Sequence, residues 1–479
     1  METLAGYVFS DTWENTDAVL HLIWGLQMSK SNDTGAEHDL ETRLERAFGP
    51  HIEAVCTRTA RALESCGYSG LLVYAGAPLP VFADDRTYPF EVNAPFKVWA
   101  PLADAPGSFL WFEPGSAPRV IIERPEDYWY KPADLPRGYW IRHFDIRTAP
   151  DRTTARRQLP PGLSRAAYLG DVFPELASWG LGAVNPAPLT RRLDYVRAAK
   201  TPYELECLRE ASRLGALGHR AAAAAFAAGA SEFGIELAFL AACGLREQEL
   251  PYNPIIALNA GGAVLHYQVL EKRPPAERLS LLIDAGAEFG GYASDITRTY
   301  ARANGDFAAL ITRVDRMQQS LCAGVRAGVD WREVHLAAHR LTAEVLHEAD
   351  LIRCSAEEAV ATGVTRVFLP HGIGHLLGLE VHDVGGLMRS AEGGEIPRPE
   401  GHPYLRLTRV LEEGFVVTME PGIYFIPQLL SAARADARSR HINWSRVEAL
   451  APFGGIRIED DLAVTPSGHE NLTRAAFDS

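Results

Sequence analysis

The 479-residue sequence predicts a mixed α/β (α+β) fold with two domains. A chain of this length is typical of two domains rather than one. Residues 71–74 and 119–122 are short apolar runs of the kind that form buried strands, whereas 40–66 and 306–350 have apolar residues at helical spacing. Because such runs are mixed along the chain without a solenoid repeat, they favour helices packed on strands, with a boundary near residues 190–202.

The composition narrows the class of protein. With 47% hydrophobic and 23% charged residues, it is typical of a globular chain. The formal net charge of -14 argues against a nucleic-acid partner, because phosphate binding needs a basic face. No apolar run reaches the roughly 18–20 residues of a membrane span. The six cysteines form no CxxC motif, and so few in a long chain favour a reduced, cytoplasmic protein.

Residues 1–40 are expected to form a flexible N-terminal extension. Its apolar patch at 18–26 follows acidic residues rather than a basic region, which argues against a secretory signal. Residues 29–39 are polar, and Met28 is open as an alternative start.

Residues 41–198 are expected to form the first domain and 199–479 the second. In the first, a helix over 40–66 ends at Gly67. Short strands are expected at 71–74, 107–112, 119–122 and 166–170, among loops rich in proline and aromatic residues.

The second domain is expected to begin with a capped helix. Thr201 is a good N-cap, Pro202 suits the first turn, and Glu204 completes a capping box. Ser231 starts a second helix. A strand carrying His266 is expected within 259–268, two helices within 306–350, and strand and loop from there to the end.

Residues 281–300 predict a β-hairpin. An apolar run enters it, Gly290 and Gly291 form a two-residue turn, and a β-branched and aromatic run leaves it. In this register Phe289 faces Tyr292, and Asp284 faces Thr297.

Asp284 and Asp295 then become diagonal neighbours on one face, with Cβ atoms roughly 7–8 Å apart or somewhat less. Two carboxylates on a buried strand pair repel each other and lose hydration, so a cation is expected between them. The alternative is a surface hairpin with two solvated aspartates, although the apolar entry strand argues against it.

Later segments hold residues that could complete such a site. His371, His375 and His382 lie within twelve residues, among glycines that allow close backbone approach. A lone histidine near apolar residues is usually structural, but three together weaken that interpretation. Glu420 ends an apolar run before a Pro-Gly turn, where an acid is often only a solvated turn residue.

Arg457 and Glu459 share one face of an alternating strand, and a surface salt bridge is the simpler interpretation of that pair. A consistent set nevertheless emerges: Asp284, Asp295, His375, Glu420 and Glu459. Four carboxylates and one imidazole suit Mn²⁺ or a similar divalent ion better than a thiolate-rich zinc site would. Four negative charges balance two divalent cations, which bridging carboxylates can hold together.

These motifs together resemble the creatinase/aminopeptidase P metallopeptidases, and within them the bacterial Xaa-Pro dipeptidases, or prolidases. From about Lys200 to the C-terminus, the motifs match the family in their order and spacing. The resemblance extends into the first domain through residues 82–85, 96–99 and 128–129. The segment 402–406 is similar to the bacterial prolidase group, which includes organophosphorus acid anhydrolases.

The resemblance implies an N-terminal creatinase-like α/β domain followed by a pita-bread catalytic domain, in a homodimer. It implies hydrolysis of dipeptides with C-terminal proline by a hydroxide bridging two divalent metal ions, most often Mn²⁺. The alternatives are hydrolysis of organophosphorus triesters, an aminopeptidase P acting on longer peptides with proline second, and a peptide-binding module without catalysis. The complete ligand set argues against the last of these.

The resemblance also implies roles for residues. Asp284 would bind one metal, His375 and Glu420 the other, and Asp295 and Glu459 would bridge both. Glu420 would also shuttle the proton of the nucleophile.

His382 would polarise the scissile carbonyl, and Arg457 would pair with the proline carboxylate. Residues expected to bind substrate in addition are His371, His266, Tyr252, Asp85 and Trp129, the last two across the dimer. Trp331 departs from the smaller aromatic usual at its position, and would narrow the leaving-group pocket if it lined it.

Overall fold

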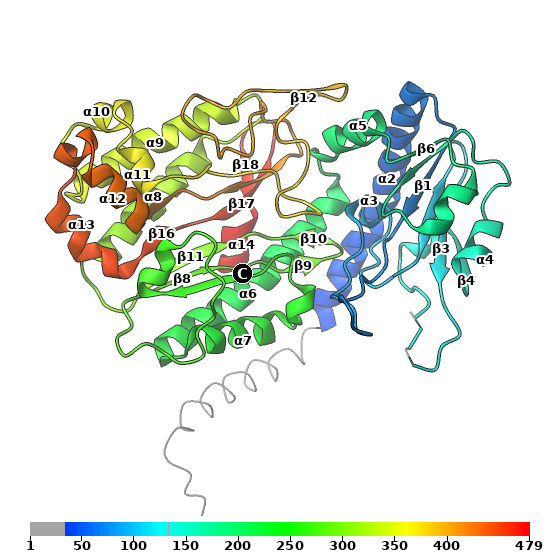
Figure 1. Cartoon of the computed structure of the whole chain (residues 1–479), viewed down its shortest axis with the longest axis horizontal. Helices are drawn as coiled ribbons and strands as arrows, with labels where there is room; N and C mark the ends of the chain where they lie inside the picture. The colour runs from blue at the N-terminus through cyan, green and yellow to red at the C-terminus, as the bar shows by residue number, and fades with distance from the viewer. Residues whose placement is uncertain (1–33, 130, 133) are drawn as a thin grey trace, which may run out of the picture.

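The first domain is built on a six-stranded sheet and a long helix. The chain, seen in a computed structural model, is described over residues 34–129, 131–132 and 134–479. The sheet has the strand order β4-β3-β2-β1-β5-β6, and helices α2 and α5 lie beside it (Figure 1). The elements of this domain are α2 (Thr34–Cys66), β1 (Gly70–Tyr74), α3 (Ala94–Lys97), β2 (Phe109–Phe112), β3 (Arg119–Glu123), β4 (Asp145–Ala149), α4 (Arg152–Arg157), β5 (Ala166–Leu169), β6 (Ala183–Val184) and α5 (Ala187–Arg197).

The expected extension at 1–40 falls largely outside the described residues. Of its last part, residues 34–40 belong to α2 and are helical rather than a flexible tail. The four short strands expected in this domain are present as β1, β2, β3 and β5, and their buried runs form its core.

The second domain places small sheets between two pairs of helices (Figure 1). Helices α6 and α7 cover one side, and α8 and α9 the other. Its first half contains α6 (Pro202–Ala228), α7 (Glu232–Cys243), β7 (Ile255–Leu258), β8 (Ser280–Asp284), β9 (Glu288–Phe289), β10 (Tyr292–Ala293), β11 (Thr297–Ala301), α8 (Asp306–Ala323) and α9 (Trp331–Glu348). Its second half contains α10 (Ala356–Ala361), α11 (Thr365–Phe368), β12 (Met388–Ser390), β13 (Gly393–Glu395), β14 (Val416–Met419), β15 (Gly422–Tyr424), α12 (Pro427–Arg434), α13 (Trp444–Leu450), β16 (Gly455–Arg457), β17 (Asp460–Val464), β18 (His469–Asn471) and α14 (Leu472–Asp478).

The capping box at the start of α6 is confirmed. The Thr201 hydroxyl accepts from the Glu204 backbone N–H, and the Glu204 carboxylate accepts from the Thr201 N–H at 2.7 Å. Ser231 caps α7, and the two helices expected within 306–350 are α8 and α9. None of the described helices is long and apolar enough to cross a membrane.

Two predictions about this domain were wrong. The segment around His266 is a 3-10 turn and irregular chain rather than a strand. It follows strand β7 in the chain but does not pair with it. The region after residue 350 contains five short helices in addition to the expected strands and loops.

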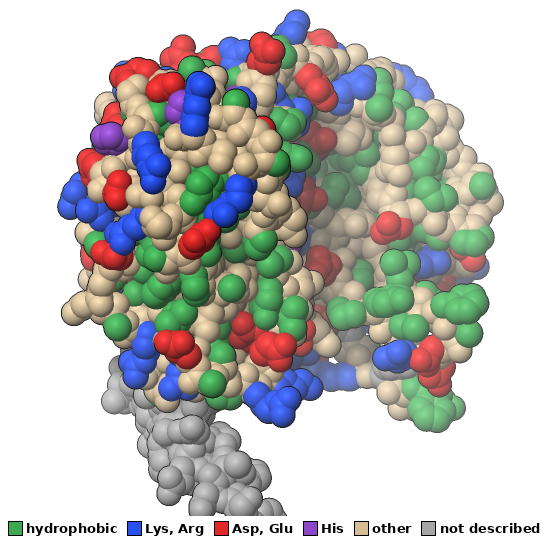
Figure 2. Space-filling view, turned by 60° about the vertical axis from the view of Figure 1, so that its left-hand side comes forward, with side chains coloured by type: hydrophobic (Ala, Val, Ile, Leu, Met, Phe, Trp, Pro, Cys, Tyr) green, Lys and Arg blue, Asp and Glu red, His purple; other side chains and the backbone are tan. Residues whose placement is uncertain are grey.

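Buried ion pairs join the two domains. Asp383 accepts from Arg197 at 2.5 Å and from the Lys200 ammonium at 2.9 Å, and the side chains of Lys200 and Asp383 are fully buried. At a second contact, Lys97 lies 3.3 Å from Glu288 on the hairpin. A groove between the domains is visible in Figure 2, and a cleft of about 710 Å³ is lined from both sides, by residues 90–104 and 245–251 among others.

His219 in α6 predicts a dependence of stability on pH. It is fully buried, bonds to the Ala285 carbonyl at 2.9 Å, and burial lowers its pKa to about 3. Because its pKa is 6.5 in the unfolded chain, the unfolded state takes up a proton first as pH falls. The contribution of neutral His219 to the free energy of unfolding is therefore fully present above pH 6.5 and is lost between pH 6.5 and 3. Protonation costs about 2 kcal/mol at pH 5.

His219→Gln is expected to lose about 2 kcal/mol less stability than the wild type between pH 8 and pH 5. Urea unfolding at several pH values measures this. The matched control is His347→Gln, since His347 is exposed, and this variant should keep the wild-type slope. Parallel slopes for His219→Gln and wild type would refute the assignment.

Candidate active site

The β8–β11 hairpin has the predicted register. Phe289 pairs with Tyr292, and Thr297 pairs with Asp284. Gly290 and Gly291 have φ of 61° and 90°, and a turn with both central residues in this region favours Gly-Gly, Asn-Gly or Asp-Gly. The turn therefore sets which residues of the two strands share a face.

Inserting one alanine between Gly290 and Gly291 is expected to turn one aspartate of the pair to the opposite face, because side chains alternate along a strand. Divalent metal held between the two aspartates should then be lost, as measured by elemental analysis. The control is the same insertion between Ala391 and Glu392, in the turn of the β12–β13 hairpin. An inserted variant that kept its metal would overturn this register.

Asp284 and Asp295 are buried together and joined by a tyrosine. The Tyr252 hydroxyl lies 2.8 Å from Asp284 Oδ1 and 2.7 Å from Asp295 Oδ1. The Arg457 guanidinium donates from Nη2 to Asp284 Oδ2 at 2.6 Å. The aspartates are 9% and 5% exposed, so the solvated-hairpin alternative is excluded.

His375 faces the aspartates from a glycine-rich loop. Its Nε2 lies 3.5 Å from Asp295 Oδ2 and 3.9 Å from Glu420 Oε1. Its Nδ1 donates to the Leu376 carbonyl at 3.0 Å, which leaves the Nε2 lone pair free to bind a cation. The loop requires glycine at Gly374, because a Cβ there would lie 2.1 Å from the Thr418 carbonyl oxygen.

The two glutamates approach from the ends of other strands. Glu420 follows β14, and Glu459 lies between β16 and β17. The Thr297 hydroxyl donates to Glu459 Oε2 at 2.6 Å and accepts from Arg457 Nε at 3.1 Å. Thr297 therefore orients both, and the surface salt bridge considered for Arg457 and Glu459 is not what the structure has. One ligand atom from each of Asp295, His375 and Glu459 lies within 4.8 Å of the others.

The charge of this cluster fits divalent cations. Burial raises the pKa of Glu420 to about 7, with Asp295 and Asp284 adding to the effect, and it raises the pKa of Glu459 well above its usual range. Burial is the main cause of both shifts and repulsion from neighbouring carboxylates adds to it, while Arg457 acts in the opposite direction. Divalent cations would offset this repulsion, and the donor set of oxygens and one imidazole suits them.

Two further histidines lie beside the carboxylates. His371 bonds through Nε2 to the Tyr424 hydroxyl at 2.9 Å, and the His382 ring centroid lies 4.4 Å from that of His375. Burial lowers the pKa of each to about 4. Both are therefore neutral at pH 7 and can donate one N–H bond each. His266 is exposed.

Three predicted residues lie elsewhere. Asp85 and Trp129 are exposed on the first domain, Trp129 by 75%, and no described contact joins them to the cluster within this chain. Trp331 is fully buried in the core, where its ring lies under Gly374. The prediction that Trp331 could narrow a substrate pocket was wrong, because packing beneath the histidine loop occupies the ring.

Two other residues contribute to the site that were not predicted from the sequence. Tyr424 contacts both His371 and Arg457, the latter at 2.9 Å, and lies on β15 directly after the Pro-Gly turn. Asp383, next to His382, is held by the domain junction described above. The adjacency of Tyr424 to the Met-Glu-Pro-Gly motif is the one signal that could have found it.

Two protein families match the chain, one in each of its two domains. Residues 206–466 match metallopeptidase family M24, and residues 46–195 match the N-terminal domain of Xaa-Pro dipeptidase. The Xaa-Pro dipeptidase of Xanthomonas euvesicatoria pv. vesicatoria is 48% identical over 437 residues, 91% of this chain and 99% of that protein. That of Stenotrophomonas maltophilia is 48% identical over 431 residues, 90% and 97% of the two chains.

Solved structures give the fold. Escherichia coli aminopeptidase P with the inhibitor Pro-Leu has a TM-score of 0.67 at 21% identity, over 90% of this chain and 95% of that one. Proline aminopeptidase P II from Yersinia pestis has a TM-score of 0.66 at 22% identity, over 90% and 96%. The expected creatinase-like domain followed by a pita-bread domain is confirmed.

Proposed function

The chain belongs to metallopeptidase family M24 and has the N-terminal domain of the Xaa-Pro dipeptidases, and from this we propose that it is a metal-dependent Xaa-Pro dipeptidase that hydrolyses dipeptides with C-terminal proline. The observation that carries the proposal is the convergence of His375, three buried carboxylates and the partly buried carboxylate of Glu420, with Arg457 buried against Asp284. The relatives named Xaa-Pro dipeptidase match nearly end to end. The aminopeptidase P structures share the fold at low identity, so an aminopeptidase P or a triester hydrolase is not favoured.

The proposed cofactor is two Mn²⁺ ions per chain. Asp284 would serve one ion, His375 and Glu420 the other, and Asp295 and Glu459 both. The mutual approach of these side chains supports the assignment. Bound there, the ions would lower the pKa of a water molecule and polarise the substrate carbonyl.

The protein side chains would handle protons and orientation. Glu420 has a pKa raised by burial and lies beside the cluster, so it suits the transfer of a proton from the nucleophile to the proline nitrogen. His382, neutral at pH 7, would donate to the oxyanion that develops on the scissile carbonyl. His371, His266 and Tyr252 would line the substrate site, with Tyr252 also holding the two aspartates in place.

Arg457 would bind the proline carboxylate. Each of its three nitrogens already donates one bond, to Thr297, Tyr424 or Asp284. Because a guanidinium has five N–H groups, one on each terminal nitrogen is still available to a carboxylate.

The assembly would be a cytoplasmic homodimer without a nucleic-acid or membrane partner. In it, Asp85 and Trp129 would reach the neighbouring active site, with Asp85 placed to capture the amine of the dipeptide. The exposure of both residues leaves them free for such a contact.

The test is a peptide panel. Purified protein with Mn²⁺ should hydrolyse Leu-Pro and Gly-Pro, and should leave the tripeptide Arg-Pro-Pro largely intact. Rapid cleavage of Arg-Pro-Pro with little dipeptide turnover would show an aminopeptidase P instead. A larger kcat/KM for a fluorophosphonate than for Leu-Pro would indicate a triester hydrolase.

A further inference from the structure

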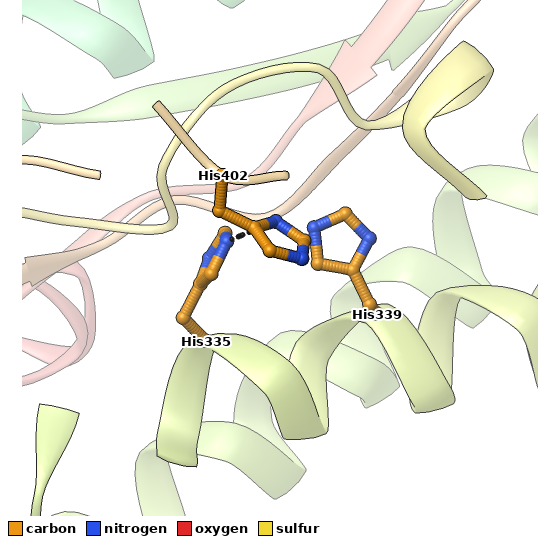
Figure 3. A group of neighbouring side chains, drawn as sticks. All are labelled: His335, His339 and His402. Atoms are coloured by element: carbon orange, nitrogen blue, oxygen red, sulfur yellow. Dashed lines mark hydrogen bonds between the residues drawn. The ribbon is translucent and has the colours of Figure 1, made fainter. Parts of the chain in front are cut away.

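Three histidines that take no part in the carboxylate cluster meet between helix α9 and a loop. His335 and His339 are one turn apart on the same face of α9, and His402 comes from the loop between β13 and β14 (Figure 3). Their ring centroids lie 4.6–4.9 Å apart. One ring nitrogen from each lies within 4.8 Å of the others.

Two ring nitrogens of this triad are buried without a hydrogen-bond partner. His335 is 1% exposed and His339 is 2% exposed. His339 bonds through Nδ1 to the Thr365 hydroxyl at 3.1 Å, and its Nε2 has no partner. His335 Nε2 and His402 Nδ1 share one proton across 2.9 Å, which leaves His335 Nδ1 without a partner. Orphaned buried polar atoms are costly and call for an explanation, and an ion bound within the triad would give one for His339 Nε2.

We propose that His335, His339 and His402 bind one borderline divalent ion, such as Zn²⁺, at a site separate from the carboxylate cluster. The ligands are His335 Nε2, His339 Nε2 and His402 Nδ1. Three neutral imidazoles are a zinc-type donor set, whereas the carboxylate cluster offers the hard oxygen donors that suit Mn²⁺. The Thr365 hydroxyl fixes the His339 tautomer, leaving Nε2 as the ligand atom.

The geometry is within reach of a tetrahedral site. With metal–nitrogen bonds of about 2.0–2.1 Å, the nitrogens of such a site lie roughly 3.4 Å apart. His335 and His402 must separate slightly from 2.9 Å, and His339 must approach from within 4.8 Å. His402 can adjust because it lies on a loop. A cavity of about 10 Å³ lies beside the triad, is lined by His335, His402 and Arg366 among others, and is about the size of one water.

The electrostatic surroundings make the site available at neutral pH. Burial lowers the pKa of His335 to about 3 and that of His339 to about 2, so their lone pairs are free at pH 7. The exposed Arg366 is a positive charge that acts on His339 and His402 and disfavours a cation. Affinity below that of the carboxylate cluster is therefore expected. An ion here would tie the 401–406 loop to α9, beside His371.

Zinc stoichiometry tests the proposal without reference to activity. Wild type, His402→Leu and His339→Asn are dialysed against excess Zn²⁺, and zinc per chain is measured by elemental analysis. We expect about one equivalent less in each variant than in wild type. The control His347→Leu changes an exposed histidine of the same helix and should keep the wild-type content.

The same comparison is made in an Asp295→Asn background, where the carboxylate cluster is impaired, and the difference of about one equivalent should persist. Electron paramagnetic resonance of added Cu²⁺ in this background should show hyperfine coupling to more nitrogens than the one of His375, and His402→Leu should reduce the number of coupled nitrogens. Equal zinc content in wild type and both triad variants would overturn the proposal, and so would an equal loss in His347→Leu. Either outcome leaves the proposed dipeptidase function untouched.

Discussion

Asp295→Asn is expected to lower kcat/KM for Leu-Pro on the order of 10³-fold. Asparagine keeps the shape and the Oδ1 acceptor that faces Tyr252, but it removes the charge of the carboxylate that lies closest to His375. If Asp295 serves both metal ions as proposed, its loss costs several kcal/mol of transition-state stabilisation, which corresponds to that factor. Steady-state kinetics with Mn²⁺ and metal analysis of the same sample measure the effect.

The matched control is Asp306→Asn. Asp306 begins α8, is exposed, and pairs with Arg446 on the surface. Its removal should change kcat/KM less than about twofold, because exposed ion pairs contribute little. If Asp295→Asn retained both metal and activity, Asp295 would not be a ligand and the cluster would need another arrangement.

Arg457→Lys is expected to lower kcat/KM for Leu-Pro about 100-fold or more. Lysine keeps the positive charge, but it cannot reach Asp284, Thr297 and Tyr424 together and still present two N–H groups to a carboxylate. Leu-Pro and Leu-Pro-amide are compared, because the amide lacks the carboxylate. If Arg457 binds that carboxylate, the preference of the wild type for Leu-Pro should nearly vanish in the variant.

Arg298→Lys is the control for a partly buried, paired arginine. Arg298 lies on β11 and pairs with Asp460 at 2.7 Å. This variant should keep the substrate preference even if stability falls. An equal loss on both substrates in Arg457→Lys would instead assign Arg457 only to holding Asp284.

Local signals account for the correct structural predictions. The hairpin register followed from a two-residue Gly-Gly turn, and the start of α6 from Thr201 and Glu204. Both are set by residues adjacent in the chain, so neighbouring sequence contains the necessary information. The five ligand positions were found because motif spacing and resemblance reinforced each other, while their roles toward metal are still predictions.

The errors arose where distant packing decides the outcome. The five helices after residue 350 have only four to eight residues, as in Ala356–Ala361 and Pro427–Arg434, too few turns to show a period. Trp331 is covered by a loop more than forty residues away in sequence, next to Gly374. His402 contacts His335 across 67 residues of sequence, so the sequence shows only that His335 and His339 are spaced one helical turn apart.

The hairpin tip has a consequence for how this protein can evolve. Its turn packs against the first domain, where a Cβ on Gly291 would lie 3.1 Å from Lys97, and Lys97 pairs with Glu288 beside the turn. A gene fusion that attached a foreign first domain would leave this turn without its partner. The two domains are therefore expected to be inherited as one unit. A substitution of Lys97 during evolution is expected to be accompanied by a matching substitution of Glu288.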